Sequence, residues 1–277
     1  MRFGWSPTET SARIRGFAKI AALLSIAAYV LLYLVQPFSV FWNTLVADLF
    51  YPAAALFPAL VATMIWARYE AADSPRRVWA SFAIGLWLWV VAELIWGYLN
   101  VIQGEVPISL ADVFWASAYF FFSRALLQQY QILARPTARE LSGRILIGIL
   151  CLLVFNLLIY ALLIAGADAP SKLDAVVNSF YPAADLLLAL VALWHVRHFM
   201  GGAFSRPWLG LLAFTFADLM YAWVVISGLY PASIEQGNWL STISDVAYFG
   251  AYLILGLGIL SHWVFLRYGL RSPARAP

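Results

Sequence analysis

Eight long apolar runs constrain this chain more than any other feature of its sequence. The chain is 64% hydrophobic and only 11% charged, with a mean hydropathy of +0.81. A soluble domain carries about 25% charged residues, whereas a membrane-spanning helix needs about 20 predominantly apolar residues. The predicted spans are Phe17–Val35, Trp42–Trp66, Val78–Ile102, Leu110–Leu133, Ile145–Gly166, Ala175–His198, Pro207–Tyr230 and Leu240–Arg267. We therefore expect an all-α, polytopic protein of the lipid bilayer.

Arginine and lysine residues between the spans indicate how the chain is oriented. If the N-terminus is cytoplasmic, fifteen of them fall on the inner side and Lys172 alone falls on the outer side. The remaining cation, Arg124, lies within the fourth span. This asymmetry predicts that both termini are cytoplasmic. It also attributes the net charge of +3 to topology and anionic lipid, not to nucleic-acid binding.

Short motifs recur in the two halves of the chain, in the same order. Residues 50–54 recur at 180–184 as Phe-Tyr-Pro-Ala-Ala, Ala92-Glu93-Leu94 recurs as Ala217-Asp218-Leu219, and Asp112-Val113 with Ala118-Tyr119 recurs as Asp245-Val246 with Ala251-Tyr252. Because each unit holds four helices, both copies would cross the membrane in the same direction, as parallel repeats. We expect repeat units at 1–134 and 145–277, joined by a cytoplasmic linker at 135–144.

Six carboxylates lie inside the predicted spans, where each charge costs at least about 2.5–3.5 kcal/mol near the bilayer centre. They are Asp48, Glu93, Asp112, Asp185, Asp218 and Asp245. All six fall between the predicted outer ends and the midplane of the membrane. This one-sided clustering predicts an outward-facing polar pocket between the repeats.

Aromatic side chains share a helical face with these acids, at spacings of three or four residues. The candidate ligand-binding residues are the six acids together with Tyr51, Trp96, Trp115, Tyr119, Tyr181, Tyr221, Tyr248 and Tyr252. Asn100 and Asn178 lie on the same faces. Asp112 and Asp245, which match under the repeat, are the expected paired anchors of the pocket.

The chemistry of this pattern leaves its occupant open. Carboxylates ringed by Tyr and Trp suit an organic cation, through charge and cation–π contacts of ~0.5–2 kcal/mol each. Carboxylate oxygens also suit a metal ion, and a desolvated carboxylate can take up a proton. Alternatively, Tyr hydroxyls and Asn amides bind the acids across helix interfaces without a ligand, at roughly 0.6 kcal/mol per bond. No cofactor is identified by the sequence.

Histidines and prolines add weaker signals. His195, His198 and His262, near the inner helix ends, have the chemistry of b-type haem ligands, but the arginines beside them favour ordinary interfacial residues. Pro52 and Pro182 each remove a backbone hydrogen bond at the depth of the acids and predict a bend. The sequence holds no hydrolase, nucleotide-binding or metalloprotease motif, so we do not expect an enzyme.

Two segments resemble a known class of sensor module. They are Pro-Ile-Ser-Leu-Ala-Asp-Val-Phe at 107–114 and Phe-Tyr-Pro-Ala-Ala-Asp-Leu-Leu-Leu at 180–188. They resemble the multi-helix membrane sensor modules that precede diguanylate cyclase and histidine kinase domains in bacteria, which often carry Pro-Ser-x-Ala-Asp-x-x-Tyr and Tyr-Pro-x-x-Asp-Leu-Leu. Only ten residues follow Arg267, too few for either output domain.

The resemblance and the acidic cluster together predict a sensor or receptor-like membrane protein. It would bind a small molecule or cation from outside and signal through a separate cytoplasmic partner or as a homodimer. The alternatives are a secondary transporter or ion-coupled permease that uses the same carboxylates, and a structural subunit of a membrane complex. A transporter needs a polar path to the cytoplasm, and the inner half holds little beyond Ser123, Arg124 and Gln128.

Overall fold

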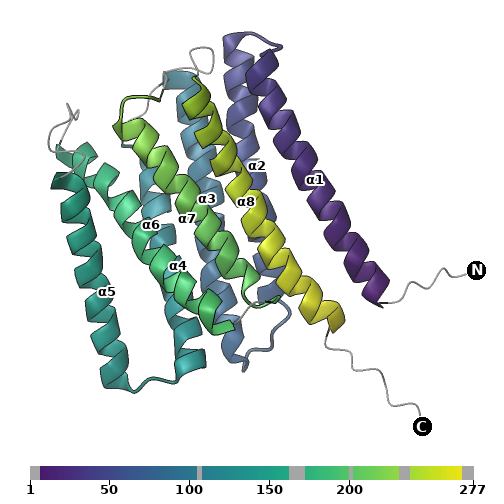
Figure 1. The fold of residues 1–277 in the computed structure, drawn as a ribbon, viewed down its shortest axis with the longest axis vertical. Helices are drawn as coiled ribbons and strands as arrows, with labels where there is room; N and C mark the ends of the chain where they lie inside the picture. The colour runs from purple at the N-terminus through teal and green to yellow at the C-terminus, as the bar shows by residue number, and fades with distance from the viewer. Residues whose placement is uncertain (1–6, 105–107, 162–171, 200–201, 231–237, 270–277) are drawn as a thin grey trace, which may run out of the picture.

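A computed structural model places eight long helices side by side in one bundle (Figure 1). It describes residues 7–104, 108–161, 172–199, 202–230 and 238–269. The helices are α1 (Pro7–Val35), α2 (Val40–Trp66), α3 (Ser74–Gln103), α4 (Leu110–Ala134), α5 (Ala138–Ile159), α6 (Lys172–Phe199), α7 (Arg206–Ile226) and α8 (Trp239–Val264), followed by the π-helical turn Phe265–Gly269. Each of the eight is long and apolar enough to cross a membrane. The expected all-α, multi-pass membrane protein is confirmed.

Several helix ends differ from the predicted spans, because hydropathy detects only the apolar part of a helix. α1 begins at Pro7, ten residues before the predicted Phe17. α5 begins at Ala138, since the Thr137 hydroxyl accepts from the Glu140 N–H while the Glu140 carboxylate accepts from the Thr137 N–H, a capping box. Of the segment 135–144 that we interpreted as a linker, only 135–137 lies outside a helix.

Successive helices run in opposite directions, so the start of α1 and the end of α8 lie at the same end of the bundle (Figure 1). Within each half, α2 packs on α3 and α3 on α4, as α6 packs on α7 and α7 on α8. The halves meet where α2 packs on α8 and α4 packs on α6. α1 lies mainly against α8, whereas α5 lies against α6 at the far edge. Six inner helices therefore enclose the core.

Aromatic rings fill the centre of this core. Trp89 stacks on Phe214 with ring centroids 4.1 Å apart and meets Phe122 edge-on at 4.5 Å. Phe82 lies 5.5 Å from Phe122. All four side chains are buried, with Trp89 2% exposed and the others 0%. We call these four residues the aromatic layer.

Arginines gather at one end of the bundle, where α2 ends, α3 begins, α4 ends and α5 begins (Figure 1). We call this the basic end; it carries Arg68, Arg76, Arg77, Arg135, Arg139 and Arg144. The guanidinium of Arg76 lies 5.6 Å over the ring of Trp66, an arrangement typical of the aromatic belt at a membrane–water interface. The six carboxylates lie toward the opposite end, with Asp185 at the middle of its helix.

Candidate functional site

Tyrosine hydroxyls and one asparagine amide bind the six carboxylates, in pairs that mostly cross helix interfaces. We call this set the acid–tyrosine network. Its acids are Asp48, Glu93, Asp112, Asp185, Asp218 and Asp245, and its partners are Tyr33, Tyr51, Tyr119, Tyr181, Tyr230, Tyr248, Tyr252 and Asn100. Four of the acids are buried, while Asp112 and Asp218 are half-buried. The sequence-predicted acids therefore do come together.

Tyr119 on α4 joins one acid of α6 to one acid of α7. Its hydroxyl oxygen lies 2.9 Å from Asp185 Oδ1 and 3.0 Å from Asp218 Oδ2. A phenol has one hydrogen to donate, so both contacts are hydrogen bonds only when one carboxyl donates back. Asp185 Oδ2 is buried and accepts no hydrogen bond from an N–H or O–H of the described residues, and the two carboxyls lie within hydrogen-bonding reach of each other. The pair therefore has room for a shared proton or a cation.

Glu93 on α3 is contacted by two tyrosine hydroxyls of α8. The Tyr252 hydroxyl donates to Glu93 Oε1 at 2.5 Å, and the Tyr248 hydroxyl approaches the same oxygen at 3.2 Å. The indole of Trp115 faces this carboxylate, but its buried Nε1 completes no hydrogen bond with a described residue. One donor beside Glu93 is thus still available.

Asp112 and Asp245, the expected paired anchors, have different surroundings. Asp112 Oδ1 accepts from the Tyr181 hydroxyl at 2.7 Å, while Oδ2 accepts from the Ser109 N–H at 2.7 Å and so caps α4. Asp245 accepts from Tyr33 at 2.7 Å and from Tyr230 at 2.8 Å. Because α8 begins six residues before Asp245 whereas Asp112 is in the first turn of α4, only Asp112 has a capping role.

Asp48 and Tyr221 complete the network. Asp48 Oδ2 accepts from the Asn100 amide at 2.9 Å, which joins α2 to α3. Tyr221 interacts electrostatically with acids from four helices, and its ring packs 5.2 Å from Tyr230 and 5.8 Å from Tyr248. Tyr221 therefore lies among the acids, as the sequence pattern predicted.

Two residues that the helical spacing placed on these faces do not join the network. Trp96 is half-buried and makes no hydrogen bond or ring contact within the described chain. Asn178 is exposed, so its face of α6 turns outward. A spacing of three residues separates two side chains by about 60° around a helix axis, which is enough to place Tyr181 inside and Asn178 outside.

Three tyrosines of the network region were missed by the sequence analysis. Tyr29 and Tyr33 lie on α1; Tyr29 donates to Tyr51 at 2.6 Å and Tyr33 donates to Asp245. Tyr230 follows the end of α7 and also reaches Asp245. The spacing of four between Tyr29 and Tyr33 was a signal for a shared face, whereas nothing in the sequence distinguished Tyr230.

Basic side chains do not pair with the carboxyls of the network in the described residues. None of the six carboxyls has a hydrogen bond or ion pair to a described Lys or Arg. In the described residues, no group of three or more His, Cys, Asp and Glu is placed to hold a metal ion.

The histidines lie outside the network. His195 is 0% exposed and packs 5.3 Å from Trp208, and His262 is 4% exposed and packs 5.0 Å from Trp79. Both are buried between helices, whereas His198 is exposed. Their depth at the membrane interface stays a prediction.

The chain was compared with protein-family models, curated proteins and solved structures. None of the three comparisons gave a match. The contacts and charges of the acid–tyrosine network therefore carry the functional assignment.

Proposed function

We propose that this protein is an integral membrane receptor of the sensor type, which takes a small cation or a proton into the acid–tyrosine network. The observation that carries the proposal is the group of Asp185, Tyr119 and Asp218, in which a hydroxyl with a single hydrogen lies between two carboxyls. An uncompensated charge is costly in an apolar interior unless it is paired or neutralised. Because no described Lys or Arg supplies the pairing, binding of a cation or proton at this position stabilises the folded chain.

We infer further that the network is formed by two parallel four-helix repeats. Equivalent positions support this arrangement: the bond of Tyr119 to Asp218 corresponds to that of Tyr252 to Glu93. Tyr181, which donates to Asp112, corresponds to Tyr51, which lies near Asp245. The α2–α8 and α4–α6 interfaces are related in the same way. The site would then lie between the halves, as is common in duplicated membrane proteins.

One hydrogen bond joins the two segments that resemble sensor modules. The first resembling segment carries Asp112 and the second carries Tyr181, and the Tyr181 hydroxyl donates to Asp112 across the α4–α6 interface. Binding between Asp185 and Asp218 would alter the Tyr119 contact on the same pair of helices. Because α4 continues to the basic end, a shift of α4 against α6 can carry the signal to a cytoplasmic partner by changing the populations of two packings.

We also propose that the basic end faces the cytoplasm of a bacterial inner membrane. The gathering of arginines at one end of the bundle supports this orientation, since cytoplasmic loops carry the excess of Arg and Lys. The acid–tyrosine network then lies in the outer half of the membrane and receives its cation or proton from outside.

An ion-coupled transporter would use the same carboxylates, but it needs a passage to both sides. The aromatic layer lies directly beside the network, with Trp89 6.2 Å from Tyr119 and 6.0 Å from Tyr252. These closely packed rings separate the acids from the basic end. A receptor, which needs access from one side only, agrees better with this packing.

The proposal is tested by cation titration of the purified protein in lipid nanodiscs. Isothermal titration uses Na⁺, K⁺ and tetramethylammonium as probes at constant ionic strength, and a pH titration of tryptophan fluorescence covers the proton. The parent protein is expected to show one saturable transition. The variant Asp185→Asn with Asp218→Asn, which keeps the shape but removes the charge, is expected to lose it.

Glu140→Gln serves as the matched control, because Glu140 is an exposed capping carboxyl outside the network and glutamine preserves the capping box. Its transition should equal that of the parent. A parent without any transition, or a double variant that keeps it, would refute the receptor proposal. Proteoliposome uptake of a probe cation would favour the transporter instead.

A further inference from the structure

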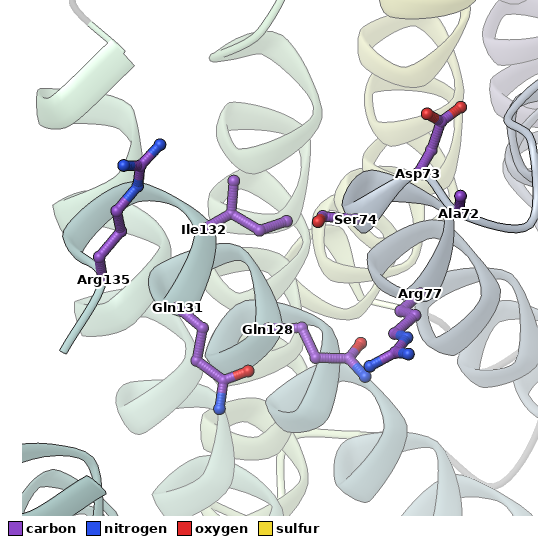
Figure 2. Close-up of a pocket in the computed structure, with 8 residues that line it drawn as sticks. All are labelled: Ala72, Asp73, Ser74, Arg77, Gln128, Gln131, Ile132 and Arg135. Atoms are coloured by element: carbon purple, nitrogen blue, oxygen red, sulfur yellow. The ribbon is translucent and has the colours of Figure 1, made fainter. Parts of the chain in front are cut away.

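A cavity of about 460 Å³ opens at the basic end, between the start of α3 and the last turns of α4. Figure 2 shows its lining side chains. They include Asp73, Ser74, Arg77, Gln128, Gln131 and Arg135. Its volume lies within the range of about 300–1,000 Å³ in which small-molecule sites fall, and its lining is polar where the surrounding bundle is apolar.

Two guanidinium groups of this cavity have no partner in the part of the chain that the structure describes. Arg77 and Arg135 make no side-chain hydrogen bond, ion pair or ring contact there. Arg76, the neighbour of Arg77 on the same helix, instead lies over the ring of Trp66. The cavity therefore carries positive charge that no described protein group uses.

The side-chain amide of Gln128 adds hydrogen-bond donors beside these guanidinium groups. The Ser81 hydroxyl donates to Gln128 Oε1 at 3.0 Å, so the Gln128 Nε2 hydrogens remain available. Figure 2 shows the Gln128 amide and the Arg77 guanidinium pointing toward one another. The Nε2 group of Gln128 and the Arg77 guanidinium are both donors and cannot bond each other. In the described residues Gln128 Oε1 accepts from Ser81 and no hydrogen bond joins it to Arg77. An acceptor between them, such as an oxyanion, would satisfy both.

The acidic residue in the lining does not compete for these donors. Asp73 Oδ2 accepts from the backbone N–H of Glu70 at 2.8 Å, and its carboxylate points away from Arg77 and Gln128 (Figure 2). No side chain caps the start of α3 at Ser74. The N-terminus of a helix favours negative charge, so α3 adds to the attraction of the cavity for an anion.

We propose that this cavity binds a phosphate oxyanion, carried either by a phospholipid headgroup or by a soluble phosphate compound. Arginine suits phosphate because its planar guanidinium donates two parallel hydrogen bonds. The neighbouring pair of Arg76 and Trp66 places the cavity at the depth of the headgroups. The site lies at the opposite end of the bundle from the acid–tyrosine network and does not depend on the receptor proposal.

The test uses delipidated protein in a phosphate-free maltoside detergent. One arm titrates phosphatidylglycerol in mixed micelles, and the other titrates inorganic phosphate; calorimetry reports the affinity in each. The parent is expected to bind saturably in at least one arm, and the arm identifies the source of the phosphate. Arg77→Gln with Arg135→Gln should weaken that binding at least tenfold. Gln131→Glu, an exposed position, should weaken it through charge repulsion.

Two controls separate this site from general charge effects and from the network. Arg76→Gln removes the same charge from the next residue and should change the affinity less than twofold. Asp185→Asn with Asp218→Asn should also leave phosphate binding within twofold of the parent. The proposal is overturned if the parent binds in neither arm, if the double arginine variant binds like the parent, or if Arg76→Gln causes an equal loss.

Discussion

The hydroxyl of Tyr119, on α4, lies between the carboxyls of Asp185 on α6 and Asp218 on α7. In the described residues, no other hydroxyl of the network contacts acids from two helices. Asp185 and Asp218 depend on this one donor, whereas Glu93 has both Tyr252 and Tyr248. Buried polar groups that lose their only partner retain the full cost of their desolvation. Tyr119 is therefore expected to matter more than any other donor of the network.

Tyr119→Phe should lower the free energy of unfolding by about 1–2 kcal/mol, the range for a buried hydrogen bond inside a membrane bundle together with an acceptor left unpaired. Reversible unfolding in mixed detergent and SDS micelles measures this change. Tyr130→Phe is the matched control, because Tyr130 is also buried but its described contacts are with the ring of Trp194 and the guanidinium of Arg144. Equal effects of the two substitutions would contradict a special role for Tyr119.

At the scale of helices, glycines allow a close contact where α3 meets α4 and where α7 meets α8. A Cβ added at Gly210 would lie 2.6 Å from Leu255 Cα, and one added at Gly85 would lie 2.6 Å from a Phe122 ring atom. Small residues let membrane helices pack this closely. The two glycines match under the proposed repeat, which supports an equivalent α3–α4 and α7–α8 geometry.

Gly210→Ala should destabilise the bundle by about 1–3 kcal/mol, because overpacking against a backbone atom forces the helices apart. Gly148→Ala in α5 has no atom within 4 Å of its added Cβ and should be neutral or slightly stabilising, since alanine is the better helix former. Thermal unfolding in detergent compares the two. A Gly210→Ala variant as stable as the parent would show that α7 and α8 do not pack in this manner.

The existence of the helices was predictable from sequence, and their exact partners were not. The length of an apolar run defines each span, but it does not tell how much of the helix is buried by its neighbours. In α5, for example, none of the residues Ala138–Ile159 is buried. Periodicity placed Tyr181 and Asp185 on one inward face correctly. It failed for Asn178, because the width of the buried face is set by neighbouring helices. It also missed Tyr33, whose bond to Asp245 exists only because α1 packs on α8.

At the scale of the whole molecule, two chemically different ends are separated by the aromatic layer. Acids collect on one side of this layer and arginines on the other. α1 supplies Tyr29 and Tyr33 to the core, while α5 lies against α6 at the far edge (Figure 1). α1 and α5, which correspond under the proposed repeat, therefore pack differently.

The proposed orientation predicts which ends react with a membrane-impermeant maleimide. In a background with Cys151→Ala, which removes the one cysteine, Ser39→Cys should be labelled on intact cells. Ala71→Cys, in the α2–α3 loop at the basic end, should be labelled only after permeabilisation. Both positions are exposed, so accessibility to the reagent decides the result. The reverse labelling pattern would place the acid–tyrosine network on the cytoplasmic side.

A receptor of this kind exchanges a cation or proton at the carboxyls of Asp185 and Asp218. Infrared difference spectroscopy on nanodisc samples, before and after addition of the probe cation or a step in pH, observes carboxyl groups directly. We expect a change in carboxyl absorption that disappears in Asp185→Asn with Asp218→Asn and persists in Glu140→Gln. A spectrum without a carboxyl change, or one that is the same in the double variant, would contradict it.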